Sequence, residues 1–282
     1  MTLSLTLHEL QTAPYIESVQ LERLEYRMLL SHVLGLSRIE LITQDQRPIT
    51  APELARIEEC IARREQGEPM AYLLGQREFY GLNFQVSPAV LIPRPETELL
   101  LELALARLPV APAAASAARV LDMGTGSGVL AVALAHTRPD CAVSALDNSA
   151  DALAVARANA QQHQARVNFI QSDWYQALPV EACFDLIMSN PPYIQAQDSH
   201  LVQGDLRFEP LGALTDHADG LSALRQIVAG AARHLAAGGW LLMEHGYDQA
   251  AAVRALLAVH GFGEVQSWRD LAGIERVSGG RL

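Results

Sequence analysis

The stretch "VLDMGTGSGVLAVALA", residues 120–135, places a loop with three glycines between two apolar runs. The first run has the length of a buried strand, and the second has the length of a helix. Gly124, Gly126 and Gly128 allow a tight turn between them and let a ligand approach the backbone. The helix that follows offers free N–H groups at its N-terminus. The stretch therefore predicts a strand, a ligand-binding loop and a helix in succession.

Strand–helix alternation continues from this stretch to the C-terminal end. Strands are predicted at residues 118–124, 142–147, 167–173, 184–190, 239–246, 263–270 and 273–282, and helices at 127–136, 149–164, 221–235 and 247–260. Apolar strands that alternate with helices predict an α/β fold with a parallel sheet covered on both faces. The last two strands have no helix between them and are expected to form an antiparallel pair.

Residues 1–75 are predicted to form a small helical domain, because apolar residues recur there at helical spacing. One helix is expected within residues 17–35 and a second within residues 50–67, where Thr50 is a candidate N-cap. The apolar face of the first helix is predicted to carry Val19, Leu21, Leu24, Met28, Leu29 and Val33.

Residues 76–95 are predicted to be a hairpin linker that joins the helical domain to the sheet domain at 96–282. Two short strands are expected around turns at Gly81 and Ser87. Their apolar residues are Phe79, Tyr80, Phe84, Val86, Val90 and Ile92. The sheet domain is expected to begin with a helix at 96–108 and a loose connection at 109–118.

Composition limits the classes of function. The net charge is −11, and the 21 basic residues form no cluster that would indicate a large phosphate-binding face. Three separated cysteines and nine histidines without ligand spacing favour a reduced protein with no disulfide and no metal. The N-terminus lacks the pattern of a signal peptide, and no apolar run approaches the ~20 residues of a membrane span. A cytoplasmic protein without a membrane partner is expected.

An acidic residue follows the glycine loop at a suitable distance. Asp147 ends the next predicted strand, where its carboxylate can accept hydrogen bonds from both hydroxyls of a ribose. The dinucleotide fingerprint would need a glycine at position 129, which is Val129. The alternative to a binding site is a purely structural role, in which the glycines form a tight turn and Asp147 caps a helix. The context of the sheet favours a site for a cofactor that carries adenosine.

The tetrad Asn190-Pro191-Pro192-Tyr193 follows a predicted buried strand, and a strand terminator would explain only one of its prolines. A planar amide or aniline-like nitrogen is a poor nucleophile, because its lone pair is delocalised. The Asn190 side-chain oxygen and the Pro191 carbonyl could hold the two N–H bonds of such a group and turn its lone pair toward a methyl donor. The prolines would keep these acceptors rigid, and Tyr193 would pack on the planar group.

These motifs together resemble the class I S-adenosylmethionine-dependent methyltransferases that act on planar nitrogen. Nearly end to end, the chain resembles the bacterial peptide chain release factor N5-glutamine methyltransferases. The matching segments are "GQREFYGLNFQVSPAVLIPRPETE", "VLDMGTGSG", "NPPYI", "EPLGALTDHADGL", "GGWLLMEHG" and "DLAGIERV". The resemblance implies a Rossmann-like sheet of seven strands, with a helical domain at 1–75 that recognises the substrate.

The resemblance also implies methyl transfer from S-adenosylmethionine, with S-adenosylhomocysteine as product, to the glutamine of the Gly-Gly-Gln loop in class 1 release factors. A monomer is expected. The cofactor site that it implies comprises Gly124, Thr125, Gly126, Ser127, Gly128, Asp147, Asn148, Asp173, Trp174 and Asn190, with Trp174 near the adenine. Asn190, Pro191, Pro192 and Tyr193 would take the glutamine, and Asn190, Pro191 and Tyr193 would carry the catalysis.

Two other functions remain open from the sequence. A nucleic-acid methyltransferase could act on the planar amine of adenine or guanine, although the acidic composition disfavours stable nucleic-acid binding. A protein that binds the cofactor without catalysis is disfavoured by the intact motifs. Arg94 could face the cofactor or the substrate, or pair with Glu96 or Glu98. Glu209 and Glu244 are expected to be structural hydrogen-bonding residues.

Overall fold

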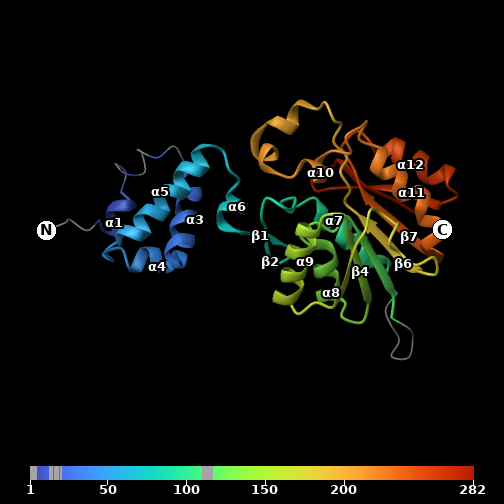
Figure 1. The fold of residues 1–282 in the computed structure, drawn as a ribbon, viewed down its shortest axis with the longest axis horizontal. Coiled ribbons are helices and arrows are strands. Elements are labelled where there is room, and N and C mark those ends of the chain that lie inside the picture. The colour runs from blue at the N-terminus through green and yellow to red at the C-terminus, as the bar shows by residue number, and fades with distance from the viewer. Residues whose placement is uncertain (1–4, 13–14, 16–18, 20, 110–116) are drawn as a thin grey trace. The chain divides into compact units, whose positions relative to one another are not determined.

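The computed structural model describes residues 5–12, 15, 19, 21–109 and 117–282 (Figure 1). The chain divides into two compact units, Met1–Gly75 and Gln76–Leu282. Each unit has its own hydrophobic core. The predicted connection at 109–118 lies largely outside the described residues, as do residues 17, 18 and 20 of the first predicted helix.

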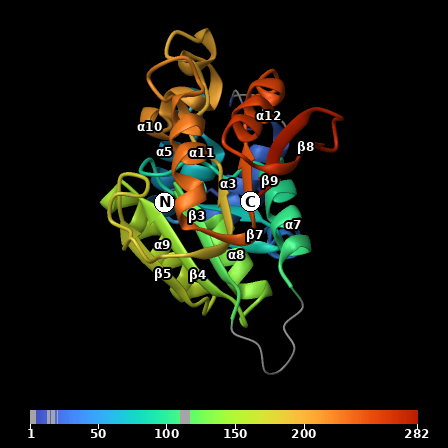
Figure 2. The ribbon, with the colours of Figure 1, turned by 90° about the vertical axis from the view of Figure 1, so that its right-hand side faces the viewer.

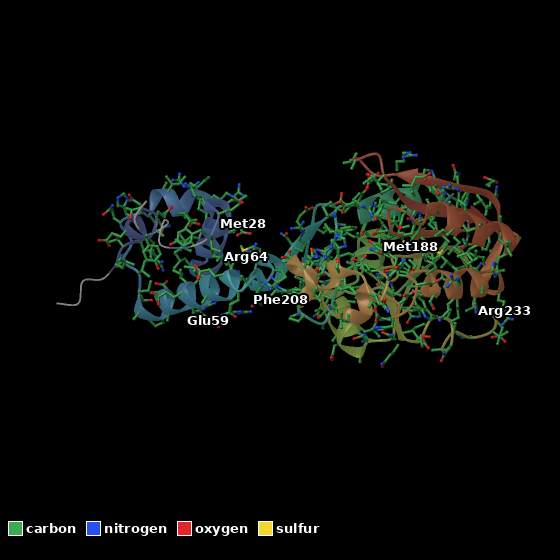
Figure 3. The ribbon with its side chains drawn as sticks, turned by 90° about the horizontal axis from the view of Figure 1, so that it is seen from above. Met28, Glu59, Arg64, Met188, Phe208 and Arg233 are labelled. Atoms are coloured by element: carbon green, nitrogen blue, oxygen red, sulfur yellow. The ribbon has the colours of Figure 1, made fainter. Side chains whose placement is uncertain are left out.

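The first unit is helical, as its apolar periodicity predicts. Its helices are α1 (Leu7–Leu10), α3 (Arg23–Leu34), α4 (Arg38–Thr43), α5 (Ala51–Glu65) and α6 (Met70–Leu74). Thr50 caps α5, because its side chain accepts a hydrogen bond from the Glu53 N–H, and the Glu53 carboxylate accepts one from the Thr50 N–H. An ion pair between Arg64, labelled in Figure 3, and Glu25 joins α5 to α3.

The prediction for the buried face of α3 was partly wrong. The helix ends at Gly35, which has a left-handed conformation, as expected. Its buried residues are Tyr26, Leu29, Leu30 and Val33, a set with i, i+3, i+4 and i+7 spacing. Leu24 does not fit this spacing, and its side chain is exposed.

A β-hairpin begins the second unit. Strands β1 (Gln76–Phe79) and β2 (Leu82–Gln85) pair antiparallel around Gly81, and Phe79 and Phe84 are buried in the core of this unit. The Gln85 N–H donates to the Asn159 side chain at 2.7 Å, which fixes the hairpin to helix α9 (Ala150–Gln162). Val90 and Ile92 are buried but lie outside the strands, so the second predicted strand ends earlier than expected.

The large sheet has seven strands in the order β5-β4-β3-β6-β7-β9-β8. Figure 1 labels β4, β6 and β7 of this sheet. The strands are β3 (Arg119–Met123), β4 (Ala142–Asp147), β5 (Val167–Gln171), β6 (Phe184–Ser189), β7 (Leu235–Glu244), β8 (Gly263–Arg269) and β9 (Glu275–Arg281). β3 to β7 are parallel, and β9 pairs antiparallel with both β7 and β8. The predicted α/β class and the antiparallel end of the sheet are confirmed.

Helices connect these strands. The α-helices are α7 (Thr97–Arg107), α8 (Val129–Thr137), α9 (Ala150–Gln162), α10 (Leu211–Leu214), α11 (Ser222–His234) and α12 (Ala250–Val259), and the 3-10 helices are η1 (Ser199–Val202) and η2 (Gly204–Phe208). The predicted helices are confirmed to within a few residues. α10, η1 and η2 were not predicted. Figure 2 labels both α10 and α11.

Both faces of the sheet are buried. Successive residues of β6 alternate between two cores: Leu186 and Met188 pack with α7 and α8, whereas Ile187 packs with α11 and α12. Figure 3 labels Met188 among the side chains of the sheet unit. Two-sided burial explains why the parallel strands are apolar throughout instead of alternating with polar residues.

Chain order places a ligand crevice beside the central strand. β3 has β4 on one side and β6 on the other, because the chain adds β4 and β5 on one side and then crosses from β5 to β6 on the other side. In open α/β sheets such a switch point lies beside a crevice at the carboxyl ends of the strands. The ends of β3, β4 and β6 carry the glycine loop, Asp147 and Asn190 to this edge. Among the described residues, the helices are too short or too polar to cross a membrane.

Candidate functional site

A cavity of about 370 Å³ lies at the carboxyl ends of the parallel strands. Its lining comes from Ala89–Thr97, from the ends of β3, β4, β5 and β6, and from residues 210–226. All of these residues belong to the second unit. The predicted cofactor residues that line it are Gly124, Thr125, Gly126, Ser127, Asp147, Asn148, Asp173, Trp174 and Asn190. The folded chain therefore gathers the predicted cofactor residues from four separate segments, 124–127, 147–148, 173–174 and 190, around one cavity.

Gly128 was also predicted to bind the cofactor, but it does not line the cavity. Its φ is +84°, and a Cβ there would lie 3.1 Å from the Ala156 Cβ and 3.2 Å from the Ala156 Cα on α9. Glycine avoids both the strain of this conformation and the crowding. Its place in the loop is thus explained by the packing of α8 against α9.

This explanation predicts a loss of stability on substitution. Gly128→Ala should lower the free energy of unfolding by about 2 kcal/mol, because it adds left-handed strain and a tight contact with Ala156. Gly273→Ala is the matched control, since Gly273 has a φ of +79° but open space around its Cα. Urea unfolding should show a larger loss for Gly128→Ala. Equal losses of unfolding free energy in the two variants would mean that backbone strain alone, and not the contact with Ala156, accounts for the effect at Gly128.

Asp147 faces the glycine loop from the end of β4. Its Oδ2 accepts the Gly126 N–H at 2.9 Å, and its Oδ1 accepts the Ser149 N–H at 2.9 Å. Burial raises the pKa of the carboxyl, and these N–H donors act in the opposite direction. Each oxygen keeps a second lone pair that can accept a hydrogen bond from a ligand. Asp147 is therefore both a support for the loop and a candidate ligand for two hydroxyls.

The side chain of Asp122 holds the glycine loop through hydrogen bonds. The sequence did not identify it as a residue of the site. The Thr125 hydroxyl donates to its Oδ2 at 2.6 Å, and the Ala131 N–H donates to the same oxygen at 3.2 Å. Burial raises the pKa of Asp122 to about 7. The signal available in the sequence was a single carboxylate inside an apolar strand, because such a group needs partners when buried.

The tetrad divides between the cavity and the protein interior. Asn190 and Pro192 line the cavity, whereas Pro191 is buried and does not line it. The Asn190 Nδ2 donates to the Thr97 Oγ1 at 3.1 Å. Thr97, at the start of α7, also lines the cavity and was not identified from the sequence. The Asn190 amide is therefore fixed at its nitrogen end.

Tyr193 does not line the cavity, although the sequence suggested that its ring would pack on the substrate. Its hydroxyl donates to the Glu244 Oε1 at 3.3 Å, and burial raises the pKa of that hydroxyl above its ordinary value. Glu244, at the end of β7, is buried. This contact gives Tyr193 a structural role and makes Glu244 a hydrogen-bonding residue, as expected for Glu244.

Arg94 pairs with a carboxylate that the sequence did not suggest. The sequence left open whether Arg94 faces the cofactor or substrate or pairs with Glu96 or Glu98; Arg94 lines the cavity, and its guanidinium donates to the buried Glu209. Glu209 also accepts the Ile92 N–H at 2.9 Å. Glu98 instead accepts the Tyr80 N–H at 2.9 Å. Because Arg94 and Glu209 are 115 residues apart, local spacing could not reveal the pair.

The segment before α11 closes one side of the cavity. Pro210, Gly212 and Ala213 contribute to the lining. Asp216, which also lines the cavity, accepts N–H groups from three residues between 218 and 222. Figure 2 shows this part of the chain around α10. The sequence pointed to this segment through "EPLGALTDHADGL", residues 209–221, one of the segments that carry the resemblance.

Within the described part of the chain, no three His, Cys, Asp or Glu side chains gather in a way that could hold a metal ion. The cavity instead offers backbone N–H groups, a carboxylate with free lone pairs, an oriented amide and the Trp174 side chain. This set suits a ligand that carries a sugar, a flat ring and a polar group.

Comparisons with known proteins agree with this arrangement. Residues 97–205 match the methyltransferase small domain family, and residues 8–75 match the PrmC N-terminal domain family. The chain is 56% identical to a release factor glutamine methyltransferase from Bordetella pertussis, over 93% of this chain and 96% of that protein. It is 53% identical to a protein of the same name from Burkholderia pseudomallei, over 96% and 95%.

The fold also has a solved relative. The structure of the Thermus thermophilus 16S rRNA N2 G1207 methyltransferase, in complex with AdoMet and guanosine, aligns with a TM-score of 0.53 and 23% identity. The alignment covers 73% of this chain and 49% of that one. This likeness supports the fold.

Proposed function

The chain belongs to the release factor glutamine methyltransferase family, and we propose that its substrate is the glutamine of the Gly-Gly-Gln loop in class 1 release factors. It is an S-adenosylmethionine-dependent methyltransferase that acts on a glutamine side-chain nitrogen. The observation that carries the assignment of the site is the Asn190 amide, which is fixed in the wall of the cavity beside the glycine loop.

The cavity fits S-adenosylmethionine. When bound, this cofactor supplies an electrophilic methyl group on a sulfonium. Asp147 has two free lone pairs with which to accept the ribose hydroxyls, and the open backbone at Gly124 and Gly126 admits a ligand without a Cβ clash. Trp174 lines the same cavity and offers a flat face for the adenine.

Asn190 and Pro191 then orient the acceptor. The Asn190 Nδ2 is held by Thr97, so its Oδ1 is the end left to accept an N–H of the substrate amide. The backbone carbonyl of Pro191, which follows Asn190 in the chain, is the second acceptor that we propose for that NH2 group, although the buried Pro191 is not among the residues that line the cavity. Two fixed N–H bonds turn the nitrogen lone pair out of the amide plane and toward the methyl group. Positive charge that develops on nitrogen is stabilised by the same acceptors.

A nucleic-acid base is a poorer substrate for this site. The only arginine in the described lining of the cavity is Arg94, and its charge is already paired with the buried Glu209. Contacts with phosphates need several available basic side chains. A protein loop, which brings no such charge, suits the site better. We further propose that the protein acts as a cytoplasmic monomer.

Methyl incorporation tests the proposal. The protein would be incubated with cofactor labelled in its methyl group and with a class 1 release factor, DNA or RNA. We expect label in the release factor and none above background in the nucleic acids. Label in RNA or DNA alone would overturn the proposal and favour a base methyltransferase.

The first unit is proposed to recognise the protein substrate, because the cavity lining lies entirely in the second unit. Deletion of residues 1–75 should raise the KM for an intact release factor by roughly tenfold, the loss of a modest protein contact. The KM for a short Gly-Gly-Gln peptide should change much less. Calorimetry with S-adenosylmethionine provides the control that the remaining unit is folded. Equal losses for both substrates would assign a purely structural role to the first unit.

A further inference from the structure

We propose that Gln249 is a positioning residue, whose side-chain amide connects the tetrad Asn190–Tyr193 to the turn at residues 216–220 and fixes the place where the substrate amide is held. The inference rests on the proposed function and deepens it. Gln249 directly precedes α12, is half-buried and does not line the cavity. Its side chain reaches three backbone groups on separate segments of the second unit.

The Gln249 amide uses both of its ends. Its Nε2 donates to the Tyr193 carbonyl at 3.0 Å and to the Gly220 carbonyl at 3.1 Å. Its Oε1 accepts the Gly246 N–H at 2.9 Å. A backbone carbonyl can only accept and a backbone N–H can only donate, so the amide has one possible direction. Each hydrogen of its NH2 group then has one carbonyl as its partner.

Gly220 allows the turn to approach the tetrad closely. Its φ is +81°, and a Cβ there would lie 2.5 Å from the Tyr193 carbonyl oxygen and 2.8 Å from the Gln249 Nε2. Any side chain at this position would therefore push the turn away from both groups. The Gly220 N–H donates to the Asp216 Oδ1 at 3.0 Å, and Asp216 lines the cavity. The link from Gln249 thus reaches a wall of the cavity through Gly220.

The stiffness of the tetrad carries the effect of this link toward the substrate. Pro191 and Pro192 fix their own φ, and each also restricts the residue before it. A shift of the Tyr193 backbone is therefore passed to the Pro191 carbonyl and to Asn190, the two acceptors proposed for the glutamine NH2 group. Gln249 holds the Tyr193 carbonyl and so limits such a shift.

Backbone hydrogen bonds already align the two segments that Gln249 joins. The Ile194 N–H donates to the Leu214 carbonyl at 3.0 Å, and the Ala196 N–H donates to the Ala218 carbonyl at 3.1 Å. These bonds set the register between the chain after the tetrad and the chain before α11. Gln249 adds an attachment of both segments to the start of α12.

Gln249→Glu tests the proposal, because glutamate keeps the shape and the acceptor oxygen but removes both donors. We expect kcat to fall about tenfold through lost alignment, with the affinity for S-adenosylmethionine unchanged in calorimetry. The affinity should hold because none of the three bonded groups belongs to the predicted cofactor residues. Gln161→Glu makes the same change at an exposed position on α9 outside the cavity lining and should keep the wild-type kcat. A Gln249→Glu variant that binds the cofactor and has the wild-type kcat would overturn the proposal.

Gly220→Ala is a second variant that leaves Gln249 in place. Its added Cβ should separate the turn from the tetrad, so kcat should fall here as well. Gly261→Ala is the matched control, since Gly261 has a φ of +84° but no atom within 4 Å of the position of a Cβ. Both substitutions add left-handed strain, and only Gly220→Ala disturbs the link. Equal kcat values in these two variants would overturn the proposal.

A measurement that needs no release factor separates this proposal from the proposed function. Amide hydrogen exchange at Ile194 and Ala196, followed by NMR, should be about tenfold faster in Gln249→Glu than in the wild type, because the two segments separate more readily. Exchange in Gln161→Glu should match the wild type. Unchanged exchange in Gln249→Glu would overturn the link, whether or not the protein methylates a release factor. Faster exchange in Gln249→Glu, together with no methylation by the wild type, would support the link and contradict the proposed function.

Discussion

Asn190→Ala is expected to reduce kcat about a hundredfold at saturating substrate and cofactor, because an oriented acceptor that acts mainly in the transition state contributes on the order of 3 kcal/mol. The Asn190 amide lines the cavity and is fixed at its nitrogen by Thr97. Alanine removes the oxygen that would hold one N–H of the glutamine amide. Single-turnover methyl transfer to a release factor is the measurement, since it reports the chemical step.

Asn190→Asp separates alignment from charge. Aspartate keeps an acceptor oxygen but loses the NH2 group that donates to Thr97. Its charge would attract the sulfonium, yet its direction would no longer be fixed. We expect the rate to fall, because alignment limits the reaction. Asn168→Ala, at an exposed position on β5, is the control. A full rate in Asn190→Ala would mean that the tetrad only ends a strand.

Asp147→Ala is expected to weaken the binding of S-adenosylmethionine by roughly 1–3 kcal/mol, because two ribose hydroxyls lose charge-assisted hydrogen bonds. The carboxylate also accepts the Gly126 N–H, so part of the loss would come from a less ordered glycine loop. Titration calorimetry measures the affinity directly.

Asp151→Ala provides the control for Asp147→Ala. It removes a carboxylate from the first turn of α9, at an exposed position that does not line the cavity. The affinity of Asp151→Ala for S-adenosylmethionine should match that of the wild type. Unchanged affinity in Asp147→Ala would remove Asp147 from the cofactor site.

The parts of the site that local patterns predict are those at the ends of strands. The glycine loop, Asp147 and Asn190 each follow an apolar run, and parallel strands bring their carboxyl ends to one edge. The sheet itself was predictable for the same reason, because its strands are buried on both faces and read as continuous apolar runs.

The partners behind these residues were not predictable. Thr97 meets Asn190 across 93 residues of sequence, and Tyr193 meets Glu244 across 51. Such contacts depend on how α7 and β7 pack around β6, which no local spacing encodes. The same limit applies to Tyr193, which was expected at the substrate because aromatic rings pack on planar groups. Its hydroxyl needed a buried acceptor, and Glu244 supplies one.

The position of the transferred methyl group tests the central claim most directly. After incubation with S-adenosylmethionine, the release factor would be digested, and the peptide that contains Gly-Gly-Gln would be fragmented by mass spectrometry. We predict one methyl group on the side-chain nitrogen of that glutamine, and none in a release factor whose glutamine is replaced by glutamate. A methyl group elsewhere in the release factor, or only in RNA or DNA added to the same reaction, would contradict the account.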